Sequence, residues 1–389
     1  MATITDVDEH IINSNLRFTT KFYNELSRNH GNVIFSPLGV YSVLSMIYQG
    51  SNEETEKQFA RTLNVPNKKA AVNGYNLIMN FLNNLEEVTF YIANKIYIMK
   101  SYSLETTFEE VVTNIFSSEI ESVNFDLLST EIANKINKWI EMKTDANFKN
   151  IISPDSLKSD IQLVAVNAVC FKGKWLDGFV KHATRVDSFF VANEEKVDCY
   201  MMYVNRQFKY KVNEDLDAEI LELPYMNENV SMVIILPRSK NGITDLEHKL
   251  MNIDLSILTQ NVLRVRVKVH LPKFKIEGTV DMKPILKEMS LDMVFDPVKA
   301  NLSGISTNSE RLCVNEIIQK VIIEVNEEGS GVALSEDEVP VITYCGKRPL
   351  PEFTADHPFM VLLQVNYGQS ANIIFCGKVL RPESTNGSI

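Results

Sequence analysis

Apolar residues recur with helical spacing in some parts of the chain and form unbroken runs in others. We expect helices at residues 11–26 and 131–142, because apolar side chains return there every three or four positions. Residues 36–50 predict a helix that starts at a Ser-Pro pair and ends at a glycine, and residues 51–55 open the next helix. Residues 161–171 are almost continuously apolar, which predicts a strand buried on both faces.

Short strands dominate the second half of the chain. They are expected at residues 218–223, 230–236, 262–271, 321–325 and 359–363. Helices early in the chain and strands later indicate an α+β fold with a large mixed sheet. No low-complexity linker or internal repeat divides the sequence, so we expect a single domain over residues 1–389.

The stretch 327–353 breaks this pattern between two apolar runs. Gly329-Ser330-Gly331 predicts a flexible joint, because glycine imposes little steric limit on the backbone. The consecutive acids at 336–338 suit solvent better than a core, and residues 344–351 include two prolines and several turn-forming residues. A connection of this length without clear structure is uncommon in a compact domain and is usually functional or disordered.

Charge and cysteine content exclude several classes of partner. The net charge of −11 argues against nucleic acid, heparin-type polyanions and anionic membranes, since each requires a basic face. No run of 18 apolar residues occurs, so no membrane span is expected. An odd, sparse set of cysteines without CxxC spacing is typical of reduced thiols and not of disulfides or zinc sites. The set comprises Cys170, Cys199, Cys313, Cys345 and Cys376.

The expected location is cytoplasmic, with a secreted alternative. The first residues contain neither a basic leader nor the apolar core of a secretory signal. If the chain shown is a mature form, the same start would be seen in a secreted protein. The Asn-x-Ser triplets at Asn229, Asn301 and Asn386 keep that alternative open.

Common catalytic and metal-site motifs do not occur in the sequence. There is no HExxH, G-x-S-x-G or G-x-G-x-x-G motif and no P-loop. The six histidines include no pair at metal-ligand spacing, and the acids at 336–338 lack the alternation of an EF-hand. We therefore expect no enzymatic activity, no metal and no cofactor.

Several short blocks follow one another in a characteristic order between residues 32 and 379. They are 32–38 with Gly50 and Thr55, 167–175, 270–274, 302–305, 326–330, 357–359 and 375–379. In composition and order, these blocks resemble the serpin (serine protease inhibitor) family. The resemblance implies a fold in which helices pack on three β-sheets, and in which an exposed reactive-centre loop, about 327–353, inserts into the large central sheet.

The resemblance also implies a mechanism. A protease attacks the exposed loop and forms an acyl-enzyme, and the freed loop inserts as an extra central strand that carries the protease away and distorts it. By the family's spacing the scissile bond lies between Thr343 and Tyr344, which suits an elastase-like pocket. Alternatives are Tyr344-Cys345 for a chymotrypsin-like enzyme and Lys347-Arg348 for a trypsin-like one.

Three groups of residues carry this mechanism by resemblance. The hinge comprises Glu327, Glu328, Gly329, Ser330, Gly331, Val332, Ala333 and Leu334. The breach, where the sheet first parts, includes Lys273 and Trp175, and Lys273 is expected to form an ion pair with Glu327. The shutter, farther down the sheet, comprises Ser36, Asn167 and Gln319.

Departures from the family pattern concern the hinge and the loop. The hinge carries Val332 and Leu334, where the family mostly has alanine. Because alternate residues of the inserted strand face the core, Glu336 and Glu338 would have to be buried, and an unpaired buried carboxylate is costly.

Further departures concern the shutter. Gly39 and Gln319 stand where the family usually has serine and histidine. We expect Gln319 still to hydrogen-bond Asn167, since an amide both donates and accepts.

Two functions remain open from the sequence. The first is a monomeric inhibitor that forms a covalent complex with a serine or papain-like cysteine endopeptidase. The alternative is a non-inhibitory protein of the same fold, either a protease substrate or a binding protein.

Overall fold

The computed structural model describes residues 6–28, 31–125, 129–143, 152–154, 161–191, 195–308, 310–332, 349–367 and 370–383. The α-helices are α1 (Asp6–Leu26), α2 (Pro37–Gln49), α3 (Glu53–Leu63), α4 (Lys68–Asn83), α5 (Thr106–Asn114), α6 (Ser129–Lys143), α7 (Ile243–Leu250) and α8 (Met282–Glu288). Short 3₁₀ turns are η2 (Lys181–Ala183), η3 (Leu255–Ile257) and η4 (Met293–Phe295).

The strands of the described residues form two hydrogen-bonded sheets. The six-stranded sheet contains β10 (Phe274–Asp281), β11 (Glu316–Val325), β12 (Gly329–Ser330), β4 (Leu163–Lys174), β2 (Val88–Met99) and β3 (Glu119–Val123), in that order. The nine-stranded sheet contains β1 (Val33–Phe35), β15 (Ser370–Val379), β14 (Phe359–Tyr367), β8 (Val230–Pro237), β7 (Ala218–Pro224), β6 (Lys196–Asn213), β9 (Arg264–Pro272) and β13 (Glu352–Thr354), with β5 (Arg185–Phe190) paired to β6.

The two sheets include the three that the resemblance implies. Along the 18-residue strand β6, residues 196–201 pair with β5, residues 201–209 pair with β9, and residues 209–213 pair with β7. The second and third expected sheets are therefore continuous with each other through β6. The predicted α+β class with a large mixed sheet is confirmed.

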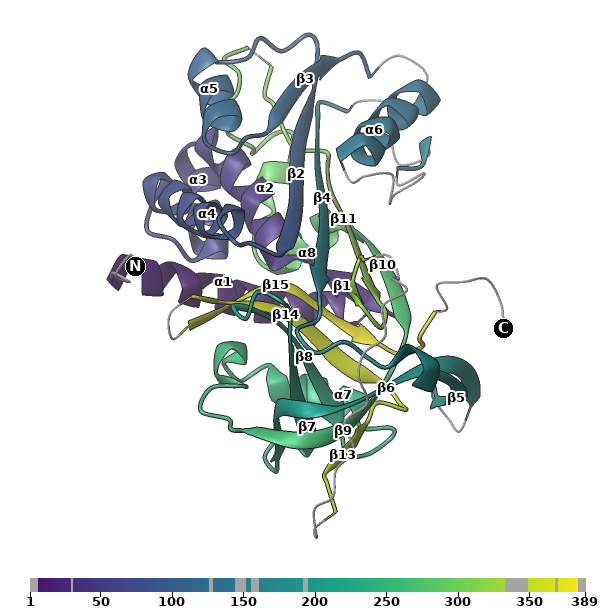
Figure 1. Ribbon diagram of the computed structural model, residues 1–389. Helices are drawn as coiled ribbons and strands as arrows, with labels where there is room; N and C mark the ends of the chain where they lie inside the picture. The colour runs from purple at the N-terminus through teal and green to yellow at the C-terminus, as the bar shows by residue number, and fades with distance from the viewer. Residues whose placement is uncertain are drawn as a thin grey trace.

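The six-stranded sheet lies between two layers of helices (Figure 1). The helices α2, α3 and α4 lie on one side of it, and α6 lies on the other. Along β4, Val164, Val166 and Ala168 belong to the apolar cluster of α6, whereas Leu163 and Ala165 belong to the cluster of α2. Both faces of β4 are thus buried, as its unbroken apolar run predicted.

Most predicted elements are present close to their expected bounds. The helix predicted at 131–142 is α6, and the helix predicted at 11–26 is α1, which starts five residues earlier. Ser36 caps α2 as expected, since its Oγ accepts a hydrogen bond from the Gly39 N–H at 3.1 Å.

Gly50 ends α2 as predicted, but for a different reason. Its φ is −90°, which any residue adopts, so the left-handed conformation of a glycine cap is not the cause. A Cβ at this position would lie 2.2 Å from Cγ1 of Ile305, and the close packing therefore requires glycine.

A charged cluster fastens α6 to the edge of the six-stranded sheet. The side chain of Lys95, 9% exposed, forms ion pairs with Glu119 at 3.0 Å and Glu121 at 2.8 Å, and it lies over the Trp139 ring of α6. Partial burial opposes ionisation of Glu119, but hydrogen bonds from Lys143, Trp139 and Lys95 lower its pKa to about 2. The helix that covers β4 and β11 is therefore anchored by charge as well as by apolar packing.

No helix in the described part of the chain is both long enough and apolar enough to cross a membrane.

Of the three Asn-x-Ser triplets, the one at Asn229 has an exposed asparagine and a fully buried Ser231. Asn301 is partly buried, and Asn386 lies outside the described residues.

Candidate functional site

The chain turns back after β11 and enters the six-stranded sheet. Gly329 and Ser330 form β12, which pairs antiparallel with β4 on one side and with β11 on the other. The Gly331 N–H continues this pairing by donating to the Glu324 carbonyl at 3.0 Å. The predicted flexible joint is thus a short strand, because neighbouring backbones satisfy its hydrogen bonds.

The C-terminal end of the stretch 327–353 is also held in a sheet. Glu352–Thr354 forms β13, which pairs in parallel with residues 268–270 of β9. Both ends of the stretch 327–353 are therefore held by strands, Gly329–Ser330 at one end and Glu352–Thr354 at the other. Residues 333–348 lie outside the part of the chain that the structure describes.

Below β12, the strands β4 and β11 pair directly with each other. Seven parallel register pairs run from Glu316 opposite Val164 to Ile322 opposite Cys170. A strand can enter here only if these backbone hydrogen bonds break. The site is therefore one strand position, occupied at its top by β12 and closed below it. We call the closed part the seam.

Ser330 points into the interior of the molecule. It is fully buried, and its Oγ lies 2.6 Å from the Tyr225 hydroxyl. Tyr225 stacks on Trp175 at a centroid distance of 4.3 Å, and burial raises the pKa of the Tyr225 phenol well above 10, so the hydroxyl is neutral. The Ser330 side of β12 is therefore its interior face. No pattern in the sequence pointed to Tyr225, which lies 105 residues from Ser330.

Asn326 closes the turn between β11 and β12. Its Oδ1 accepts hydrogen bonds from the Glu328 N–H at 2.9 Å and the Gly329 N–H at 3.2 Å, and its Nδ2 donates to the Val332 carbonyl. In the sequence, Asn326 stands out only as the first residue of the block 326–330. An asparagine before a polar, glycine-containing turn is nevertheless the usual signal for this kind of side-chain cap.

The breach ion pair is present and buried. Lys273 Nζ lies 3.0 Å from Glu327 Oε2, with side-chain exposures of 11% and 5%, and the Thr184 hydroxyl donates to Glu327 Oε1 at 2.8 Å. Trp175 Nε1 donates to the Asn326 carbonyl at 3.0 Å. Removing one partner of such a pair leaves a buried charge, so the base of the hinge is strongly fixed.

Glu328, the next hinge residue, is fixed from outside the sheet. Its carboxylate forms an ion pair with Lys181 at 2.7 Å, and its carbonyl accepts a hydrogen bond from the Trp175 N–H at 2.8 Å. Both contacts come from the segment that follows β4. The hinge is therefore held by the segment that continues β4, the strand with which β12 pairs.

The three shutter residues meet in one buried hydrogen-bond network. Gln319 Nε2 donates to Asn167 Oδ1 at 2.8 Å, which is the expected hydrogen bond, and also to the Ser36 carbonyl at 2.9 Å. Its Oε1 accepts from the Ser36 N–H at 2.9 Å. Asn167 Nδ2 donates to Asn94 Oδ1 at 2.7 Å, and Asn94 Nδ2 donates to Ser42 Oγ at 2.8 Å.

Gly39 and Gln319 fit each other. A Cβ at Gly39 would lie 2.3 Å from Asn167 Oδ1, 2.7 Å from Gln319 Nε2 and 2.7 Å from Val169 Cγ2. The space that a serine side chain would need is thus occupied by the two amides. The two departures from the family pattern are therefore one coupled change, and they leave the network intact.

Several predicted residues lie outside the part of the chain that the structure describes. They are Ala333 and Leu334 of the hinge, the acids at 336–338, Thr343, Tyr344, Cys345, Lys347 and Arg348. Val332, the last hinge residue described, is partly exposed.

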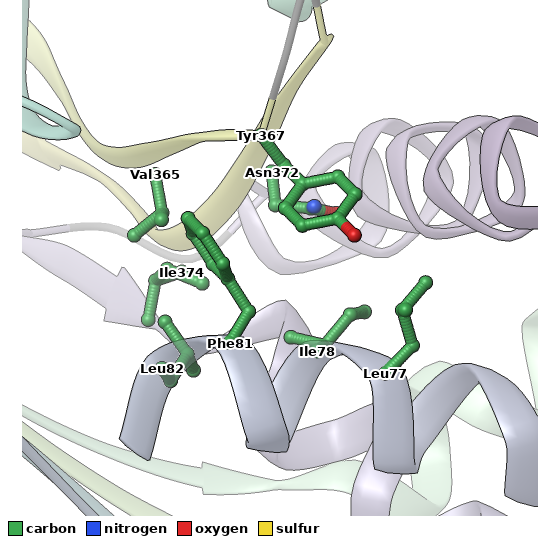
Figure 2. Close-up of a pocket in the computed structure, with 8 residues that line it drawn as sticks. All are labelled: Leu77, Ile78, Phe81, Leu82, Val365, Tyr367, Asn372 and Ile374. Carbon is green, nitrogen blue, oxygen red and sulfur yellow. The ribbon is translucent and has the colours of Figure 1, made fainter. Parts of the chain in front are cut away.

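An apolar pocket lies apart from this site, between α4 and the strands β14 and β15 (Figure 2). Phe81 and Tyr367 meet edge-to-face across it at a centroid distance of 4.7 Å. Its water-accessible volume is about 10 Å³, which is room for one water molecule and not for an organic ligand. We therefore assign it to core packing.

Because Gly39 packs against Gln319, we predict that substitutions at these two positions change the free energy of unfolding non-additively. Gly39→Ser should destabilise the protein by about 1–3 kcal/mol, because it overpacks the amide network. Gln319→His with Gly39→Ser should restore part of that loss. Urea unfolding of both single variants and the double variant measures the coupling, and strictly additive changes would show that the two positions are independent.

Comparison with known proteins agrees with this geometry. A sequence profile of the serpin (serine protease inhibitor) family matches residues 13–382. Alaserpin of Manduca sexta is 34% identical over 389 residues, which covers 98% of this chain and 96% of that protein. The leukocyte elastase inhibitor of Homo sapiens is 30% identical over 383 residues, which covers 96% of this chain and 100% of that protein.

Solved structures show the same fold. Serpin48 of the insect Tenebrio molitor, described as a highly specific serpin, matches with a TM-score of 0.87 and 30% identity, over 98% of this chain and 100% of that one. Human thyroxine-binding globulin in complex with thyroxine matches with a TM-score of 0.85 over 98% and 100%, and at 23% identity this likeness concerns the fold alone. The chain belongs to the serpin (serine protease inhibitor) family.

Proposed function

We propose that the protein inhibits a serine endopeptidase, or a papain-like cysteine endopeptidase, by inserting its cut loop into the seam. The observation that carries the proposal is β12, which is already in register between β4 and β11 above a closed seam. Because the first residues of the inserted strand are already in place, the residues that follow need only pair with β4 and β11 once the loop is cut. Two of the relatives are named alaserpin and leukocyte elastase inhibitor, and these names support the same function.

The chemistry of trapping uses the protease's own nucleophile. Its serine or cysteine attacks the scissile carbonyl of the loop, the C–N bond breaks, and the leaving amine takes the proton. The loop carbonyl stays on the protease as an ester or thioester. Insertion then competes with hydrolysis of this bond, so any interaction that favours the inserted strand increases the fraction trapped.

The lengths of the strands agree with insertion from β12. Counting along the antiparallel register from Ser330, Pro340 falls opposite Leu163 of β4 and opposite Asn315, the residue before β11. Proline cannot donate a hydrogen bond within a sheet, and it arrives where both flanking strands end. Residues 331–339 therefore supply a strand without proline for the whole seam.

The acidic loop favours a second function, a serpin-fold protein that is cut without trapping. In the same register Glu338 faces Ala165 and Ile317, both fully buried and apolar. An ionised carboxylate at that position costs free energy and slows insertion. Cleavage without insertion would make the protein a protease substrate.

We further propose that the protein acts as a monomer in a compartment that keeps thiols reduced. The four cysteines that the structure describes, Cys170, Cys199, Cys313 and Cys376, are buried, and none of them is in a disulfide. Burial raises the pKa of the Cys199 thiol to about 12, which keeps it protonated and unreactive.

Trapping is tested by incubating the protein with elastase-, chymotrypsin-, trypsin- and papain-like enzymes. We expect at least one covalent complex that survives a denaturing gel, and a rise of tens of degrees in the thermal midpoint of the cleaved protein. If every enzyme yields only a cleaved band and the midpoint stays unchanged, the loop does not insert and the second function holds.

The cut bond is read from the mass of the released C-terminal fragment. We expect a fragment that starts at Tyr344, and Thr343→Arg should redirect cleavage toward trypsin-like enzymes, because that residue fills the protease's main pocket. A fragment from the unmutated protein that starts at Arg348 would move the site to Lys347.

A substitution at Gly331 should lower the stability of the uncleaved form alone. Its φ is +61°, and a Cβ would lie 2.6 Å from the Phe171 carbonyl oxygen. Gly331→Ala should therefore destabilise the uncleaved protein by about 1–2 kcal/mol, whereas the extended inserted strand accepts alanine. We expect a lower thermal midpoint before cleavage and an unchanged one after it.

Gly329→Ala is the matched control. A Cβ at Gly329 would lie 2.0 Å from the Gly173 carbonyl oxygen of β4, and this pairing is kept in both states. It should lower the midpoint of the uncleaved and the cleaved protein alike. Equal effects of the two substitutions on both forms would contradict an inserted strand that extends through Gly331.

A further inference from the structure

Asn326, which closes the turn between β11 and β12, is held by both its main-chain and its side-chain atoms. Its N–H donates to the Gly329 carbonyl at 2.9 Å, and its carbonyl accepts from Trp175 Nε1 at 3.0 Å. Its Oδ1 accepts from the N–H groups of Glu328 and Gly329. The residue is only 5% exposed. The carboxamide therefore has a fixed position beside the chain that leaves β12.

Val332 is bonded to this carboxamide instead of to a strand. Asn326 Nδ2 donates to the Val332 carbonyl at 2.6 Å. Gly331, the residue between β12 and Val332, has a φ of +61°, which turns the chain out of the sheet. Val332 is accordingly partly exposed, whereas Ser330 is fully buried. The strand thus ends at Gly331, and the side chain of Asn326 binds the next carbonyl.

A continued β12 would give that carbonyl to β4. Ser330 lies opposite Gly173, so the antiparallel register would bring Val332 opposite Phe171. The N–H of residue 331 donates to β11, and the main-chain groups of successive strand residues point to opposite neighbours. The groups of Val332 would therefore point to β4. The Val332 carbonyl cannot reach β4 while Asn326 holds it at the turn, so the two pairings compete.

We propose that Asn326 is a positioning residue that ends β12 at Gly331 by holding the Val332 carbonyl away from β4. The consequence for trapping rests on the proposed function, because lengthening of β12 must begin at Val332. The hydrogen bond from Asn326 then sets how readily this first step occurs. One net hydrogen bond changes an equilibrium constant by roughly two- to tenfold, which is enough to shift the competition between trapping and release.

The acceptor and the donor of this carboxamide have separate roles. Its Oδ1 satisfies two N–H groups of the turn, and its Nδ2 binds the Val332 carbonyl. Asn326→Asp keeps the acceptor and removes the donor, and the two N–H groups favour its ionised form. Asn326→Ser also keeps an acceptor for the turn, without a charge. Asn326→Ala removes both groups.

The test measures the ratio of covalent complex to cleaved protein for each variant, with a panel enzyme that the parent traps. We expect this ratio to rise roughly two- to tenfold in Asn326→Asp and in Asn326→Ser, because β12 can lengthen without first losing a hydrogen bond. Asn326→Ala should raise the ratio by a similar factor. It should also lower the thermal midpoint of the uncleaved protein more than the other two, since the turn loses its acceptor.

Asn213→Asp is the matched control. Asn213 ends β6, and its Oδ1 accepts from the Leu216 N–H at 3.0 Å, so the substitution makes the same chemical change in another side-chain-capped turn. It should leave the ratio of complex to cleaved protein at the parent's value. An equal rise in Asn213→Asp and Asn326→Asp would show that added negative charge is the cause, and would overturn the inference.

The outcomes separate this inference from the proposed function. If the parent traps no enzyme and cleavage leaves its thermal midpoint unchanged, the proposed function fails, and the inference fails with it. If the parent traps an enzyme but Asn326→Asp and Asn326→Ser give the parent's ratio or a lower one, trapping stands and Asn326 only stabilises the turn. A rise in Asn326→Asp without one in Asn326→Ser would also refute the inference, because both variants lack the donor.

Discussion

Seven backbone pairs join β4 to β11 below the hinge, and the parts of the site are arranged around that seam. Above it, β12 occupies the next strand position and is fastened by the buried pair of Glu327 and Lys273. Beneath it, α2 contributes the N-terminus that the shutter amides bind. Outside it, α6 covers both strands with apolar side chains. Opening the seam therefore disturbs each of these layers at once.

The hinge lies at the upper end of the seam. Its register is fixed, because Asn326 closes the turn and Ser330 is buried against Tyr225. The positive φ of Gly331 marks the point where the chain leaves the sheet. Glycine adopts a positive φ at no steric cost, so the chain turns away from the sheet there without strain.

Buried polar groups interrupt the apolar lining of this strand position at two levels. At the top the Tyr225 hydroxyl meets Ser330, and lower down the shutter amides Asn167 and Gln319 hydrogen-bond each other. Many of the neighbouring side chains are apolar. Parting β4 from β11 would therefore break a buried side-chain hydrogen bond as well as the backbone pairs.

The sequence by itself determined the helices α1, α2 and α6, the start of α3, the buried strand β4, the family and the hydrogen bond between Gln319 and Asn167. These depend on local periodicity, on capping residues such as Ser36, and on the donors and acceptors of single side chains. Only the tertiary structure decided why Gly39 and Gly50 are glycines, that Ser330 meets Tyr225, and where β12 enters the sheet. Each of these depends on atoms far away in sequence and within a few ångströms in space, and strand register in particular is fixed by neighbours that no local pattern encodes.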